Sequence, residues 1–128
     1  MPVVSDYVFI ETANKQVTIG DDGDNHNGWT SPPFDTGGRH SGTAYISFMV
    51  SGMTESNRNA KVFLNNRPDE IGLLLRGGSG WNTQTIAFFG SLLNNGDNRI
   101  RVEAVQKSDG TNDPFKVRNP ICHFHQAT

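Results

Sequence analysis

The sequence has little of what several protein classes require. Its single cysteine, Cys122, excludes an intrachain disulfide and a thiolate metal cluster. Apolar runs last only a few residues, far short of the roughly 20 that span a bilayer, and the first ten residues lack a basic segment followed by a hydrophobic one. We therefore expect a soluble chain without a membrane span or a secretion signal, and we predict no compartment beyond that.

Charge of one sign is also scarce. Eleven Lys and Arg residues stand against thirteen Asp and Glu residues, which gives a formal net charge of −2, and neither sign gathers into runs. A surface for nucleic acid or for an anionic membrane needs concentrated basic charge. We therefore expect neither kind of partner.

Helical periodicity is missing as well, because no segment of a dozen residues repeats its apolar positions every 3.6 residues. The 128 residues instead contain 14 glycines and 6 prolines, set with Asn and Asp between short runs of Val, Ile, Phe, Tyr and Thr. Such runs favour strands, and such separators favour turns. The sequence predicts an all-β fold with little helix, in one domain over residues 1–128.

Apolar and polar residues alternate in several of these runs, as expected of strands with one buried face. In 43–50, for example, Ala44, Ile46, Phe48 and Val50 share one face. Pro120 interrupts the last run and predicts an edge strand or a bulge there. About eight strands result, which we expect to form an antiparallel two-sheet β-sandwich or jelly roll. The predicted strand regions are 6–19 (two strands), 43–50, 60–65, 71–75, 83–93, 99–106 and 115–126.

One stretch resembles a known family. The segments 60–66 (AKVFLNN), Ile71-Gly72, Trp81 and 91–102 (SLLNNGDNRIRV) are similar to the galactose-binding-like jelly rolls appended to many glycoside hydrolases. In this pattern Asn98 follows a glycine turn and can hydrogen-bond backbone groups that the turn leaves unpaired, while Leu92 and Leu93 close the end of the sandwich. The resemblance covers residues 43–106. It implies a lectin-like, carbohydrate-binding or adhesive module without catalysis, often with a structural calcium ion.

The segment 20–42 has no hydrophobic periodicity and exceeds the usual length of a structureless connection, which suggests a functional or metal-pinned loop. Asp21, Asp22 and Asp24 lie close together in it, and Asp35 lies towards its far end. Carboxylates in a flexible, glycine-containing loop suit Ca²⁺. The spacing only half resembles a calcium loop, so a solvated acidic turn is the alternative interpretation.

We expect a glycan or polysaccharide to bind at one end of the sandwich, where loop 20–42 and the turns at 76–82 and 108–114 form the rim of a shallow site. Two tryptophans there could stack on a sugar, and the alternative for each is a place in the core. Arginine, histidine and asparagine side chains could donate to sugar hydroxyls. The candidate ligand-binding residues are Trp29, Arg39, His40, Arg76, Trp81 and Asn82.

Two other function classes stay open. The chain could be a structural or assembly subunit of a virion or appendage, in which case it forms a homo-oligomer. It could also be a cupin-like metal enzyme, since His123 and His125 lie two apart on a predicted strand and share a face, with His26 or His40 as a third ligand. The glycines at 77–80 form no nucleophile elbow, because the helix that an elbow needs is missing.

Overall fold

The computed structural model describes residues 3–21, 23–37, 42–54, 58–75 and 78–127. Over these residues nine strands and one short 3₁₀ helix form two antiparallel sheets, which confirms the predicted all-β sandwich with little helix. The elements are β1 (Val3–Phe9), β2 (Gln16–Ile19), β3 (Gly28–Thr30), β4 (Thr43–Gly52), β5 (Ala60–Leu64), β6 (Gly72–Leu74), β7 (Gly78–Phe89), η1 (Gly90–Leu92), β8 (Ile100–Glu103) and β9 (Phe115–Ala127).

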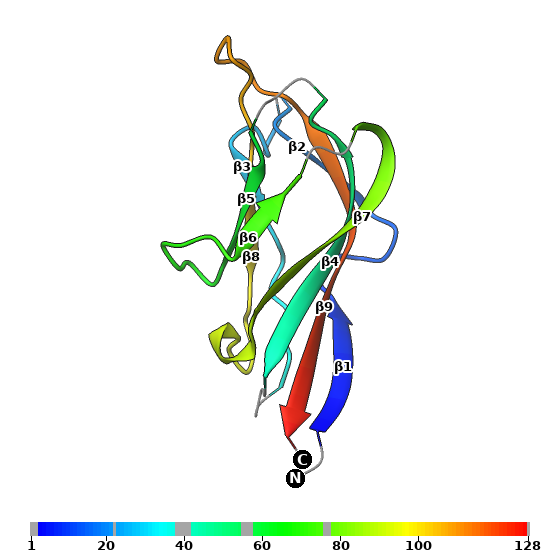
Figure 1. Ribbon diagram of the computed structural model, residues 1–128, viewed down its shortest axis with the longest axis vertical. Coiled ribbons are helices and arrows are strands. Elements are labelled where there is room, and N and C mark those ends of the chain that lie inside the picture. Colours follow the sequence, from blue (N-terminus) through cyan, green and yellow to red (C-terminus); the bar gives the residue numbers. More distant parts are fainter. Residues whose placement is uncertain (1–2, 22, 38–41, 55–57, 76–77, 128) are drawn as a thin grey trace.

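The five-stranded sheet has the order β1-β9-β4-β7, with β2 also paired to β9, and the four-stranded sheet has the order β3-β8-β5-β6. The chain crosses between the two layers repeatedly, as in a jelly roll, and Figure 1 shows the layers facing each other. In the same view the connections β2–β3 and β8–β9 lie towards one end, whereas β1 begins and β9 ends at the other. No helix in the described part of the chain could cross a membrane.

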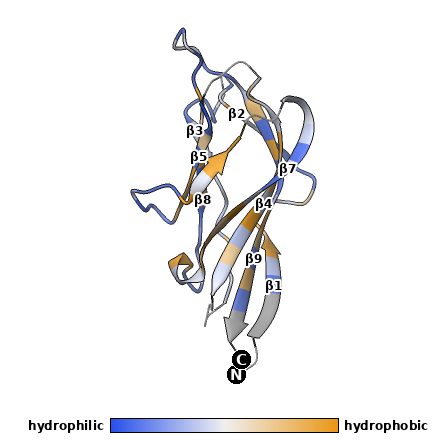
Figure 2. Ribbon diagram, in the orientation of Figure 1, coloured by the Kyte–Doolittle hydropathy of each residue, from blue (hydrophilic) through white to orange (hydrophobic). Residues whose placement is uncertain are grey.

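Alternation places the core between the sheets. Ile46, Phe48 and Val50 of β4 are fully buried, while Tyr45 and Ser47 lie on the outer face, as the sequence pattern predicts. Figure 2 shows hydrophobic and hydrophilic residues alternating along β4. The inward residues of β8 and β5 face this strand's apolar side and complete a single buried cluster.

β9 is the long central strand of the five-stranded sheet and not an edge strand. β1 pairs with its second half and β2 with its first half, and the β4 register shifts between Ser47 and Met49. Asn119, with φ of 51°, and Pro120 lie at this irregularity, and the Pro120 carbonyl accepts a hydrogen bond from Ile10 N–H. The predicted bulge is therefore present, and it lets a proline occupy a central strand.

The 94–98 turn is held by a buried asparagine, as the family resemblance implies. The Asn98 side-chain oxygen accepts hydrogen bonds from Asn94 N–H at 2.7 Å and from Asn65 Nδ2 at 2.8 Å, and its amide donates to the Asn94 carbonyl at 2.9 Å. Leu93 is buried nearby. The turn and the β5 end are thereby locked together at the end of the sandwich away from the β8–β9 connection.

The described part of the segment 20–42 contains regular structure that the sequence does not predict. It contains β3, which pairs with β8, and Phe34 bridges Asn98 further along. Trp29 lies opposite Val102 in this pairing and is only 6% exposed. The segment therefore contributes an edge strand and a core residue, and it is not a single open loop.

Candidate functional site

The outer face of the five-stranded sheet carries most of the large hydrophobic side chains that stay exposed. Because side chains alternate along a strand, the residues opposite the buried ones point to solvent. Tyr7 and Tyr45 indicate this face already in the sequence, because they are aromatic residues at positions that alternate with the inward-facing residues of their strands. The outward positions of described side chains are Tyr7 and Phe9 of β1, Gln16 and Thr18 of β2, Thr43, Tyr45, Ser47, Met49 and Ser51 of β4, Trp81, Thr83, Thr85, Ala87 and Phe89 of β7, and Lys116, Arg118, Ile121, His123 and His125 of β9.

Three aromatic side chains form a row across three strands of this face. His123 on β9 is the register partner of both Tyr7 on β1 and Tyr45 on β4. The Tyr45 and His123 rings stack with centroids 4.3 Å apart and planes 12° apart, and the Tyr7 ring lies 6.2 Å from His123 on the other side. Tyr7 is 60% exposed and Tyr45 is 38% exposed. We call Tyr7, His123 and Tyr45 the aromatic row.

The aromatic row offers polar edges together with apolar rings. Within the described part of the chain no hydrogen bond occupies either tyrosine hydroxyl, while Ser47 Oγ lies 3.3 Å from His123 Nε2. Partial burial lowers the pKa of His123, which keeps its ring neutral near pH 7. Phe9 packs edge-on against Tyr7 and extends the apolar surface by one position. The row can thus contact an apolar ligand face and hydrogen-bond to hydroxyls beside it.

A second feature lies further along the same face. The Arg118 guanidinium on β9 sits 4.5 Å from the centroid of the Trp81 ring on β7. Trp81 is 37% exposed, as the predicted ligand contact requires, although it stands on a strand and not in a loop. Arg118 Nε is buried and has no hydrogen-bond partner among the described residues. Stacking on the indole fixes the plane of the guanidinium.

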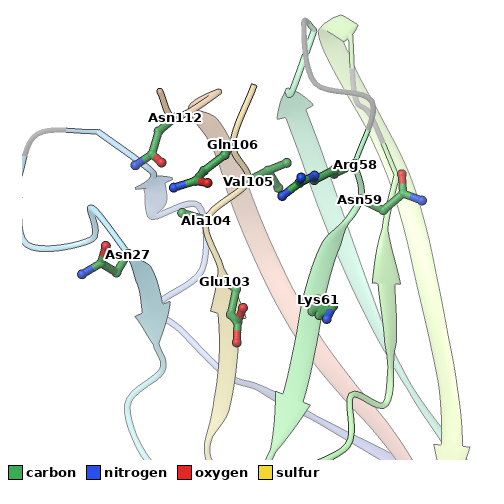
Figure 3. A pocket seen from close by; sticks show the side chains of 9 residues that line it. All are labelled: Asn27, Arg58, Asn59, Lys61, Glu103, Ala104, Val105, Gln106 and Asn112. Atoms are coloured by element: carbon green, nitrogen blue, oxygen red, sulfur yellow. The ribbon is translucent and has the colours of Figure 1, made fainter. Parts of the chain in front are cut away.

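The loop end of the sandwich contains a polar hollow of about 330 Å³ (Figure 3). Two of the predicted rim segments do meet here, because Asn112 Nδ2 donates to the carbonyls of Gly20 and His26. Lys61 and Glu103 lie opposite each other on β5 and β8, and in the described structure they form no ion pair. None of the described residues that line this hollow is aromatic. Its lining residues are Asn27, Arg58, Asn59, Lys61, Glu103, Ala104, Val105, Gln106 and Asn112.

Of the predicted ligand contacts, Trp29, Trp81 and Asn82 have described positions, and the structure does not bring Trp29 together with the other two. The expectation that Trp29 offers an exposed stacking surface is wrong, since β3 places its ring in the core. Asn82 is exposed beside Trp81, and its side-chain oxygen accepts a hydrogen bond from Gln84 Nε2 at 3.0 Å. Arg39, His40 and Arg76 lie outside the described residues.

The three described aspartates among those predicted to bind calcium, Asp21, Asp24 and Asp35, do not form one cluster. Asp21 lies near Asn112, beyond the end of β8, whereas Asp35 Oδ1 accepts a hydrogen bond from Asp97 N–H, before the start of β8. The Phe34–Asn98 bridge holds Asp35 at that distant position. The prediction that Asp35 shares one calcium site with Asp21 and Asp24 is therefore wrong. Asp24 is exposed, and Asp22 lies outside the described residues. Calcium binding at Asp21 and Asp24 stays a prediction.

The predicted metal pair does share a face, since His123 and His125 both point outward from β9. His123 stacks on Tyr45, and His125 Nδ1 lies 3.0 Å from the Thr43 carbonyl oxygen. Among the residues with described positions, no three His, Cys, Asp or Glu side chains are grouped so that they could hold a metal ion. The histidine pair therefore lacks a described third ligand.

Cys122 is a fully buried residue of β9 and packs in the core. Desolvation raises the pKa of its thiol to about 12. A thiol in this state supplies almost no thiolate at neutral pH, so it does not suit nucleophilic chemistry.

Comparison with known proteins identifies the fold. No protein-family model and no curated protein sequence matches the chain. A β-porphyranase of glycoside hydrolase family 86, BpGH86A, from the human gut bacterium Bacteroides plebeius matches over 98% of this chain with a TM-score of 0.58 and 16% identity, and this chain spans 21% of that enzyme.

Two further structures are more distant. BiXyn10A CBM1 in its apo form matches over 95% of this chain and 96% of its own, with a TM-score of 0.42 and 7% identity. A family two carbohydrate esterase from Cellvibrio japonicus matches over 98% of this chain and 35% of its own, with a TM-score of 0.36 and 10% identity. We draw nothing from these two, whose TM-scores lie below 0.5. The likeness to BpGH86A shows the fold alone, and at that level it agrees with the predicted jelly-roll β-sandwich.

Proposed function

We propose that this chain is a non-catalytic carbohydrate-binding module that holds a glycan on the outer face of its five-stranded sheet. The aromatic row supports this proposal most directly, because Tyr7, His123 and Tyr45 lie side by side across three strands and the two tyrosines stay exposed. Exposed rings beside free hydroxyl groups match a sugar, which presents C–H surfaces and hydroxyls together.

The rigidity of the platform favours binding without large rearrangement. Each ring of the row stands on a strand, and the Tyr45–His123 stack and the Ser47 hydrogen bond hold two of them in place. Contacts built on strands lose little conformational entropy on binding. The fold shared with part of a β-porphyranase is compatible with a role beside an enzyme that acts on polysaccharide.

Native gel electrophoresis in gels that contain individual polysaccharides tests the proposal. We expect one or more polysaccharides to retard the wild-type chain. We also expect Tyr45→Ala to weaken binding about tenfold, since contacts of one aromatic ring contribute about 1.4 kcal/mol. Leu73→Ala is the matched control, because Leu73 is also an exposed large side chain but lies on β6 of the other sheet. Correctly folded wild-type chain that no polysaccharide retards would overturn the proposal.

The polar hollow at the loop end is the second position for a glycan. Its amides and the unpaired Lys61 and Glu103 could hydrogen-bond to sugar hydroxyls. Lys61→Ala separates the two positions in the same gels. Loss of retardation in Lys61→Ala with normal retardation in Tyr45→Ala would move the site to the hollow, and the reverse pattern supports the sheet face.

A role as an assembly subunit is the second candidate function. Tyr7, Phe9 and Phe89 are all exposed on one sheet face, and Phe89 is 75% exposed. Exposed apolar side chains on one sheet face also mark protein contacts. Sedimentation of the wild-type chain and of Phe89→Ser tests this candidate. A stable oligomer that Phe89→Ser dissociates supports it, and a monomer at all concentrations contradicts it.

A further inference from the structure

The outer face of the five-stranded sheet has a charge pattern that the whole chain does not have. Its outward positions with described side chains carry Lys116, Arg118 and two histidines, and they carry no carboxylate. The chain as a whole has a net charge of −2. The opposite sheet shows both signs, with Arg101 and Glu103 on β8 and Lys61 on β5. Among the described side chains of the two sheets, cations without carboxylates therefore occur on the face that carries the aromatic row.

Arg118 has no acidic partner in the described structure. Its side chain forms no ion pair with a described residue, and its buried Nε atom has no acceptor among those residues. Its nearest ring contact is Trp81, which orients the guanidinium without neutralising its charge. A guanidinium without an acidic partner in the described structure can pair with an anionic acceptor that a ligand supplies. A planar carboxylate or a sulfate fits such a fork of donors best.

Lys116 adds a second cation two residues before Arg118 on the same face of β9. It is exposed, and it borders a hollow of about 260 Å³ whose lining includes the hydroxyl-bearing residues Thr18, Ser51 and Ser79. Cationic and hydroxyl donors around one hollow suit an anionic group with several acceptor oxygens. Residues two apart on a strand are about 7 Å apart, which places the two cations along a common line.

We propose that the glycan is acidic, with its carboxylate or sulfate groups paired to Arg118 and Lys116 while its sugar rings contact the aromatic row. This inference rests on the proposed function and adds the ligand class to it. A neutral glycan can accept hydrogen bonds from Arg118 but brings no negative charge to pair with it. An acidic one supplies the acceptor and also meets no repelling carboxylate on the outward positions described above.

Matched polymers test the ligand class. Titration calorimetry compares a polyuronate with its methyl ester and a sulfated galactan with its desulfated form, all at low and at high salt. We expect at least one acidic polymer to bind tenfold or more tightly than its neutral partner, and we expect the ratio to fall as salt rises. The pair that shows the preference identifies carboxylate or sulfate as the recognised group.

Variants locate the preference. Lys116→Ala and Arg118→Ala should each reduce the acidic-to-neutral ratio at least threefold, whereas Arg67→Ala and Arg99→Ala, exposed cations elsewhere, should leave it unchanged. Lys116 is exposed, so Lys116→Ala should fold normally and should test the charge preference even if Arg118→Ala folds poorly.

Equal binding of acidic and neutral polymers that Tyr45→Ala abolishes would overturn this inference and leave the proposed function standing. An equal loss in all four cation variants would likewise overturn it, because general charge would then explain the preference. Absence of binding to every polymer would overturn the proposed function itself, and this inference with it.

Discussion

Asn98 is the most heavily hydrogen-bonded buried side chain at the closed end of the sandwich, and its replacement by alanine has a calculable cost. Its side chain is fully buried and makes three short hydrogen bonds, to Asn94 N–H, to Asn65 Nδ2 and to the Asn94 carbonyl. Each such bond contributes about 1 kcal/mol net, and groups left buried without partners cost somewhat more. We therefore expect Asn98→Ala to lower the free energy of unfolding by about 3–4 kcal/mol.

Urea unfolding followed by tryptophan fluorescence measures this loss, because buried Trp29 reports on the core. Asn95→Ala is the matched control, since Asn95 is an exposed asparagine in the same turn, and its replacement should cost less than about 0.5 kcal/mol. A loss below about 1 kcal/mol in Asn98→Ala would refute the reasoning, because the turn would then be held by other contacts.

Three further predictions concern the thiol, one histidine and one glycine. Cys122 should not react with a thiol reagent in the native protein at pH 8 and should react fully in urea, since burial raises its pKa to about 12; rapid native labelling would contradict its placement. Burial lowers the pKa of His123 in the folded state, so the unfolded chain binds the proton more readily. The stability that the neutral ring contributes should therefore be fully present above about pH 6.5, the pKa of an unperturbed histidine, and should decline as the pH falls below that value. Urea midpoints at a series of pH values measure this, and His123→Gln should remove that part of the pH dependence; an unaltered profile in the variant would disprove the assignment. Gly28→Ala should destabilise by about 1–3 kcal/mol, because its φ is +151° and an added Cβ would lie 2.7 Å from the Val102 carbonyl oxygen, whereas at Gly80 an added Cβ meets nothing within 4 Å and Gly80→Ala should be neutral in the same assay.

Strands in which apolar and polar residues alternate could be predicted from the sequence, together with the face that they bury. β4 is the clearest example, since its inward residues Ile46, Phe48 and Val50 alternate without a break and burial follows that pattern. β3 was missed because three residues are too few to show a period, and only pairing with β8 makes them a strand. The same pairing buries Trp29, which local composition had suggested as a surface residue.

The aromatic row could be predicted only in part. Tyr7 and Tyr45 stand in the polar phase of their strands, which is visible in the sequence. Their meeting on either side of His123 depends on the pairing of β1 and β4 with β9, strands that lie far apart along the chain. The shift of register between Ser47 and Met49 makes the neighbours across β4 and β9 still harder to predict, because a bulge changes which residues lie opposite each other. Sequence reasoning therefore placed the site at the glycine-rich loops, where polar composition is obvious.

The central claim is that a glycan occupies the outer face of the five-stranded sheet. The most direct test is a ¹⁵N–¹H NMR titration of the wild-type chain with an oligosaccharide cut from a polymer that it binds. We expect the largest shift changes in Tyr7, Tyr45 and His123 and in the neighbouring residues of β1, β4 and β9. Changes confined to Asn27, Glu103 and the residues around the loop-end hollow, with the aromatic row unaffected, would contradict the account.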